Sequence, residues 1–161
     1  MLHRADPGSH IQVGDATIFT IMSSGAWTGH AFRNGYVRMP KRLREESYDG
    51  IVAWVNVHGG ITYAKEDGLG IMVYGFDTNH VFDDHTWDIP RVQVECRRML
   101  IGLRLLEKYE KAYRLAEGVF DMGQIRSLLR DQYESDVQRE MVAQGLIMEE
   151  VESGTSSWSS S

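Results

Sequence analysis

The sequence predicts an α+β fold, in which a small antiparallel sheet of four or five strands is covered by two C-terminal amphipathic helices. Two observations lead to this prediction. Short runs rich in β-branched and aromatic residues fill the first half of the chain, and apolar residues recur at spacings of three and four from Pro90 onwards. With 161 residues, the chain is long enough to form one domain around a single core.

Several segments are expected to form the sheet. Residues 17–22 and 35–40 are rich in strand-forming residues and end at turn residues or proline. The run IVAWVNV (51–57) is the strongest strand prediction, because its length suits a buried strand and is too short for a typical helix. The segments 61–65 and 71–77 flank the turn signal EDGLG, which predicts a hairpin.

Two helices are expected after the strands. Proline suits the first helical position, so a helix is predicted from Pro90 to about Ala116, and its apolar face contains Val92, Cys96, Met99, Leu103 and Leu106. A second helix, ending near Gly145, is predicted from apolar residues at every fourth position: Ile125, Leu129, Tyr133, Val137 and Met141. Cys96 lies on the apolar face of its helix, and a single cysteine in that position is typical of a small buried hydrophobic residue.

The chain is predicted to have three parts. Residues 1–15 are polar and interrupted by proline and glycine, which predicts an irregular N-terminal arm. Residues 16–146 form the single α+β domain. Residues 147–161 are acidic and then serine-rich, and their small apolar content predicts a disordered tail.

Composition restricts the classes of function. The net charge of −6 argues against a general nucleic-acid binder, and no apolar run approaches the roughly 20 residues of a membrane helix. The charges are unevenly distributed. A basic strip (Arg33, Arg38, Lys41, Arg42 and Arg44) precedes an acidic centre (Asp49, Glu66, Asp67, Asp77, Asp83, Asp84 and Asp88). The first residues lack the pattern of a secretory signal, so a reducing cytoplasm is the expected location.

The stretch VHGGITYA (57–64) is the first candidate for a functional site. A pair of glycines weakens a strand but allows positive φ and leaves backbone N–H groups able to approach a ligand closely. The hydroxyl of Thr62 and the ring of Tyr63 follow directly. Since neighbouring strand residues point in opposite directions, these two need not share a pocket. We therefore expect His58, Gly59, Gly60, Thr62 and Tyr63 to contribute to ligand binding, unless the glycines only form a turn.

The stretch GFDTNHVFDD (75–84) is the second candidate. Four carboxylates and two imidazoles lie between residues 77 and 88: Asp77, His80, Asp83, Asp84, His85 and Asp88. Such groups can hold a divalent metal, act as general base and orienting acid, or accept hydrogen bonds from a sugar or base. Their spacing does not choose among these roles. Turn capping with the other residues in solvent is the remaining alternative, so no catalytic residue and no metal ligand is assigned.

Several common catalytic motifs are absent from the sequence. It contains no GxGxxG after a strand, no GxxxxGK[ST], no HExxH, no GxSxG and no CxxC pair. The sequence therefore lacks the motifs that define several classes of protein: dinucleotide-binding folds, P-loop proteins, zincins, hydrolases with a nucleophile elbow and zinc ribbons.

A resemblance adds to these patterns. The motifs GYVRMP, VHGGITY and GFDTNHVFD, followed by a helix containing ECRRM, resemble those of small uncharacterised proteins encoded by tailed bacteriophages. The resemblance covers roughly residues 34–106. It implies a phage accessory role in the cytoplasm of the host cell and a pocket that includes His58, Gly59, Gly60, Thr62, Tyr63, Gly75, Phe76, Asp77, His80 and Asp83.

Three functions follow as hypotheses. The leading one is binding of a small polar, nucleotide-derived ligand, with sequestration of a host defence signal as its use. The second is a metal-dependent hydrolase, in which His58, Asp77, His80 and Asp83 hold a divalent metal that activates water. The third is inhibition of a host protein through the long helices. A homodimer is also expected, because the apolar face of the first helix is long for one small sheet to cover.

Overall fold

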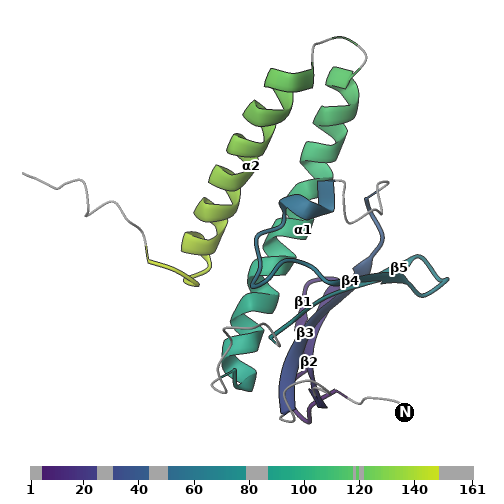
Figure 1. Cartoon of the computed structure of the whole chain (residues 1–161), viewed down its shortest axis with the longest axis vertical. Helices are drawn as coiled ribbons and strands as arrows, with labels where there is room; N and C mark the ends of the chain where they lie inside the picture. Colours follow the sequence, from purple (N-terminus) through teal and green to yellow (C-terminus); the bar gives the residue numbers. More distant parts are fainter. Residues whose placement is uncertain are drawn as a thin grey trace, which may run out of the picture.

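The computed structural model describes residues 5–24, 31–43, 51–78, 87–117, 119 and 122–148. It has the α+β fold that the sequence predicts, with a five-stranded antiparallel sheet and two long helices (Figure 1). The strand order is β1-β2-β3-β5-β4, and every neighbouring pair is antiparallel. The strands are β1 (Ile11–Val13), β2 (Ala16–Ser24), β3 (Ala31–Pro40), β4 (Tyr63–Glu66) and β5 (Ile71–Asp77).

The two faces of the sheet have different surroundings. Helix α1 (Ile89–Glu117) packs against β2 and β3 on one side, which we call the inner face. We call the opposite side the open face, because no described helix packs on it (Figure 1). Side chains alternate along each strand, so Val37 points to the inner face and is fully buried, whereas its neighbour Tyr36 points to the open face.

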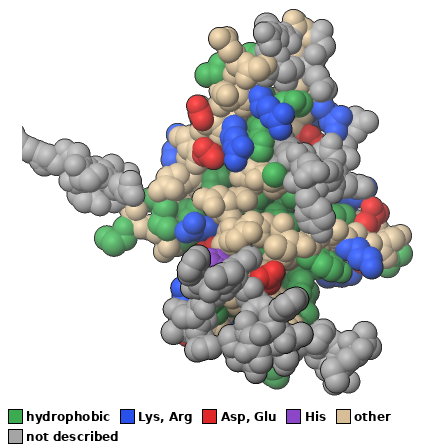
Figure 2. Space-filling model, in the orientation of Figure 1, with side chains coloured by type: hydrophobic (Ala, Val, Ile, Leu, Met, Phe, Trp, Pro, Cys, Tyr) green, Lys and Arg blue, Asp and Glu red, His purple; other side chains and the backbone are tan. Residues whose placement is uncertain are grey.

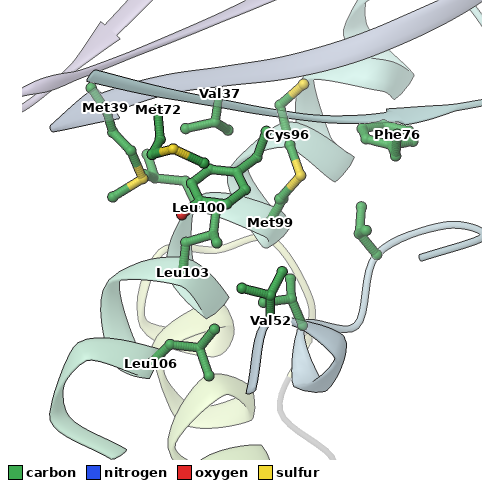
Figure 3. Packing of buried hydrophobic residues seen from close by; sticks show 14 of the residues in the cluster. Val37, Met39, Val52, Met72, Phe76, Cys96, Met99, Leu100, Leu103 and Leu106 are labelled. Carbon is green, nitrogen blue, oxygen red and sulfur yellow. The ribbon is translucent and has the colours of Figure 1, made fainter. Parts of the chain in front are cut away.

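The hydrophobic core lies between the inner face and α1 (Figure 3). The sheet contributes Val37, Met39, Met72 and Phe76, and α1 contributes the predicted apolar stripe, whose five members are at most 2% exposed. Burial raises the pKa of the Cys96 thiol to about 12, as expected for a cysteine that serves as a core residue. The amphipathic face predicted for the first helix is therefore confirmed.

Helix α2 (Met122–Ala143) packs along α1 rather than directly on the sheet (Figure 1). Its Tyr133 is buried and donates a hydrogen bond of 2.9 Å from its hydroxyl to the carbonyl oxygen of Gly102 on α1. A Cβ atom at Gly102 would lie 2.8 Å from that hydroxyl oxygen, so the glycine permits the close approach of the two helices. The predicted second helix and its apolar face are confirmed.

The strand predicted at residues 51–57 is wrong. Residues Ile51–Trp54 form a short 3-10 helix, η1, and the chain then continues without regular structure to β4. Val52, Trp54, Val55 and Val57 are nevertheless buried, and the Trp54 ring lies 5.8 Å from that of Tyr133. A short apolar run indicates burial, but its periodicity cannot distinguish a strand from another buried conformation.

The N-terminal arm is more ordered than the sequence predicts. Residues 11–13 form the edge strand β1, and Ala5 pairs with Ile21 in an isolated bridge. The Asp6 carboxylate accepts hydrogen bonds from the Thr20 hydroxyl and from Arg33 Nε at 2.9 Å. Because this ion pair is largely buried, it holds polar residues in place that have too little apolar area to pack on their own.

Two cations of the basic strip pair with carboxylates of the acidic centre, and a third pairs with a carboxylate outside it. Arg38 pairs with Asp67 at 3.1 Å and Lys41 pairs with Glu66 at 3.0 Å, while Arg42 pairs with Asp15 of the β1–β2 turn. Basic and acidic side chains are likewise interspersed on the face drawn in Figure 2. The described cations of the strip are therefore largely neutralised by neighbouring carboxylates.

Candidate functional site

The two glycines of the HGG segment form a turn. Gly59 and Gly60 have φ values of 71° and 79°, and the Gly60 N–H donates to the carbonyl oxygen of Val57 at 2.8 Å. Residues with side chains rarely adopt positive φ, which explains both glycines. A Cβ atom at Gly60 would meet nothing within 4 Å, so backbone conformation, rather than a close neighbour, requires glycine there.

His58 lies beside the start of α1. Its backbone N–H donates to Glu95 Oε1 at 3.0 Å, and its ring centroid is 4.5 Å from that of Trp87. The Arg91 guanidinium lies on Trp87, 3.8 Å from the ring centroid. These contacts place His58 on the side of the sheet that α1 covers.

The segment after the glycines leads directly into the sheet. The Thr62 N–H donates to the carbonyl oxygen of Gly75 at 2.8 Å, which joins the two sequence motifs through the backbone. Tyr63, the first residue of β4, is directly opposite Gly75 and is 41% exposed. Its ring points to the open face, because it contacts the ring of Tyr36 edge-on at 5.9 Å.

The residues of the second motif separate to the two faces of the sheet. Phe76 is 1% exposed and belongs to the core, so its ring is not available to a surface ligand. Asp77 is the next strand residue and points to the open face, where it lies opposite Asn34. His80 and Asp83, like Asp84 and His85, lie outside the described residues.

The structure thus divides the expected site. The two motifs are adjacent through their backbones, but His58 is on the α1 side, whereas Tyr63 and Asp77 are on the open face. Asp88 caps α1, since its side chain accepts a hydrogen bond from the Arg91 N–H at 2.9 Å. Among the described residues, no group of three or more His, Cys, Asp or Glu side chains could hold a metal ion.

The sequence prediction missed an aromatic row on the open face. Phe19, Tyr36, Gly75 and Tyr63 are consecutive partners across β2, β3, β5 and β4. Phe19 and Tyr36 stack with centroids 5.2 Å apart, and His10 stacks on the other side of Phe19 at 5.3 Å. We refer to His10, Phe19, Tyr36 and Tyr63 as the aromatic row.

Gly75 makes this row continuous. A Cβ atom at Gly75 would lie 2.6 Å from Cδ1 of Tyr36, so the Tyr36 ring occupies the space above the glycine. The ring thereby crosses β5 and reaches Tyr63 on the far strand. Burial raises the pKa of Tyr36, and the nearby Tyr63 and Asp77 raise this pKa further, despite a hydrogen bond from Asn34.

An unsatisfied polar atom lies beside the row. Asn34 Nδ2 donates weakly to the Tyr36 hydroxyl at 3.4 Å and to Ser23 Oγ at 3.5 Å. Asn34 Oδ1 is buried and accepts no hydrogen bond from any described residue. A buried acceptor without a donor costs about 1–3 kcal/mol, so a bound N–H or O–H group would be favourable there.

The aromatic row could not be found from the sequence alone. Phe19, Tyr36 and Tyr63 are separated along the chain by 17 and 27 positions, and only the strand register brings them into one line. The available signal was an aromatic residue at an outward position on each of three strands, and β3 carries a second one, Phe32, that does not belong to the row. That signal becomes specific only when the strand order β2-β3-β5-β4 is known.

Comparisons with known proteins add no assignment. Searches of protein-family models, curated proteins and solved structures find no match to the chain. Within the described part of the chain, no helix combines the length and apolar character that a membrane span requires.

Proposed function

We propose that the protein binds the planar, nucleobase-like part of a small nucleotide-derived ligand on the open face of its sheet. The aromatic row carries the proposal, because its four rings form a continuous line across the sheet and its end member Tyr63 is 41% exposed. Stacking of one base on an aromatic side chain contributes about 1–3 kcal/mol and tolerates any base, because every base has a π-face.

Polar groups beside the row would orient the ligand. Asn34 Oδ1 is a buried acceptor that would pair with an N–H group on the edge of a base. Asp77 lies opposite Asn34 on the same face and is a second acceptor. Two acceptors next to stacked rings favour a planar ligand whose edge carries hydrogen-bond donors.

The charges favour recognition of the base over that of the phosphate. Arg38, Lys41 and Arg42 are paired with carboxylates, and their attraction for a phosphate is correspondingly reduced. The HGG turn is part of this proposal only through the backbone bond that positions Tyr63 beside β5. The proposed biological use is the one the phage resemblance implies, which is sequestration of a nucleotide signal of the host.

The metal-dependent hydrolase receives less support. It requires His58 and Asp77 to share one metal, and their side chains are on different sides of the sheet. We therefore place the ligand on the aromatic row and assign it no reaction.

The test is a calorimetric titration with purine and pyrimidine nucleosides and nucleotides. Tyr63→Ala is expected to weaken binding by about 1–3 kcal/mol, because it removes one stacking surface. Tyr113→Ala is the matched control, since Tyr113 is a partly exposed tyrosine of α1, remote from the row. Binding that Tyr63→Ala leaves unchanged, or no binding of any base-containing ligand, would contradict the proposal.

A second candidate function is association through the far end of the helical hairpin. Leu115 near the end of α1 and Leu128 in α2 are 75% and 64% exposed, and Val119 between the helices is 73% exposed. Exposed apolar side chains that adjoin in one patch are typical of contact surfaces, and we propose that these three form such a patch. Light scattering should give the mass of a homodimer for the wild type and of a monomer for Leu115→Ser/Leu128→Ser. A monomeric wild type would contradict self-association and leave a host protein as the partner to test.

A further inference from the structure

A cavity of about 240 Å³ lies where β1, α1 and the last turn of α2 meet, away from the aromatic row. Its walls include the apolar side chains of Val13, Leu100 and Ile101 and the charged side chains of Arg97, Arg104 and Glu140. Pockets for drug-sized ligands measure about 300–1,000 Å³, so this one suits a smaller molecule.

The cavity is formed by defined elements. Residues 97, 100, 101 and 104 lie three or four positions apart and therefore share one side of α1. Helix α2 ends in a Schellman motif, in which Gly145 has a φ of 74° and the Leu146 N–H donates to the Met141 carbonyl oxygen at 2.9 Å. This motif fixes the end of α2, whose last turn brings Glu140 to the wall of the same cavity.

The charges in the cavity are only partly paired. Arg104 donates to the Val13 carbonyl oxygen and to Asp15 Oδ1, the latter at 3.2 Å, so its charge is compensated. Arg97 has no hydrogen bond or ion pair with any described residue. Glu140 accepts a hydrogen bond from Gln144 Nε2 at 3.0 Å but forms no ion pair within the described residues. One cation and one anion therefore line the same apolar cavity without pairing.

This arrangement distinguishes among ligand classes. A simple carboxylate would be attracted by Arg97 but repelled by Glu140. A simple amine would be attracted by Glu140 but repelled by Arg97. A molecule with both charges and an apolar side chain satisfies Arg97, Glu140 and the apolar wall together. We infer that the cavity binds a free apolar α-amino acid, with its carboxylate on Arg97, its ammonium on Glu140 and its side chain against Leu100 and Ile101.

The experiment is a calorimetric titration with leucine and two analogues of the same skeleton. In 4-methylpentanoate the ammonium is absent, and in 3-methylbutylamine the carboxylate is absent. Leucine is expected to bind about tenfold or more tightly than either analogue, because each analogue loses one charge-assisted hydrogen bond. Equal binding of leucine and 4-methylpentanoate, or no binding of millimolar leucine, would overturn the inference.

Two variants locate the site. Arg97→Gln and Glu140→Gln are each expected to weaken leucine binding about tenfold, and Glu140→Gln should strengthen binding of 4-methylpentanoate by removing the repulsion. Both positions are at the surface of helices, and thermal melts will verify that the variants fold. Lys111→Gln is the control, because Lys111 lies on the same helix beyond the cavity. Unchanged leucine binding in Arg97→Gln would contradict the inference, and this result would not bear on the aromatic row.

Discussion

The two faces of one sheet show how similar residues serve different purposes. On the inner face, Phe76 lies under α1 and is 1% exposed. On the open face, Tyr63 is 41% exposed and contacts another aromatic ring instead of a helix. Both rings come from the hairpin β4–β5, and only the direction of the side chain separates them.

The glycines of the two faces sharpen this comparison. Gly35 on the inner face leaves room for Phe76 and Cys96, whereas Gly75 on the open face leaves room for Tyr36. Both glycines admit an aromatic ring over the strand. On the inner face the ring completes the core, and on the open face it completes a line of rings that solvent can reach.

The largest expected effect is on the inner face. Phe76→Ala should reduce the free energy of unfolding by about 3–5 kcal/mol, because it leaves a cavity in a closely packed core. Tyr63→Ala should reduce it by about 1 kcal/mol or less, since it removes one cross-strand aromatic contact. Urea unfolding measures both. Equal losses of stability would show that the two faces do not differ as described.

Alanine at the two glycines should produce intermediate effects. At Gly35 the new Cβ would lie 2.5 Å from Cε1 of Phe76, and the core offers that ring no space, so we expect a loss of about 1–3 kcal/mol. Gly75→Ala should cost less, because Tyr36 can tilt towards solvent. It should nevertheless weaken ligand binding, because the tilt interrupts the aromatic row. A larger loss of stability for Gly75→Ala would contradict this comparison.

Alkaline pH should act in part through a tyrosine of the inner face, as it should through the buried Tyr109 and Tyr133 of the helices. Burial, with a smaller contribution from the negative charge of Glu110, raises the pKa of Tyr74 from 10.0 to about 12. The unfolded chain therefore releases this proton first, so the stabilisation is complete below pH 10 and is lost as the pH rises from 10 to about 12. Unfolding of Tyr74→Phe, measured from neutral pH to this range, should depend less on pH than that of the wild type. Parallel profiles would contradict the assignment.

The smallest effect is expected for the basic strip. Arg38 is 51% exposed in its pair with Asp67, and such surface pairs contribute about 0–1 kcal/mol. Arg38→Ala should therefore change the free energy of unfolding by less than about 1 kcal/mol. The affinity of this variant for the ligand should remain nearly independent of salt concentration. Strong salt dependence in calorimetric titrations of a nucleotide would indicate that phosphate, rather than the base, is recognised.

Much of the fold could be predicted from the sequence because local patterns determine it. Apolar spacing located both helices, and the turn signal between residues 65 and 71 located the hairpin β4–β5. The run 51–57 was misassigned, because its apolar character reported burial beneath α1 and α2 and not backbone conformation. The sequence prediction underestimated the order of the N-terminal arm. This order depends on the ion pair between Asp6 and Arg33, which lie far apart in the chain.

The candidate site was less predictable, because it depends on strand register. Sequence proximity grouped Phe76 with Asp77, but alternation sends them to opposite faces. That Tyr63 and Asp77 point to the same side of the sheet follows only from the pairing of β4 with β5. His10 and Phe19 belong to no motif, and the motif GYVRMP gave its Tyr36 no role in a site. The contacts among these three rings became visible only with the sheet order.

The most direct measurement is an NMR titration of the protein with a nucleotide, followed through its side-chain signals. Signals of open-face residues such as Tyr36, Tyr63 and Val73 are expected to shift together, while those of Val37 and Leu103 in the core remain in place. Shifts confined to His58 and Trp87, on the α1 side of the sheet, would contradict ligand binding on the aromatic row.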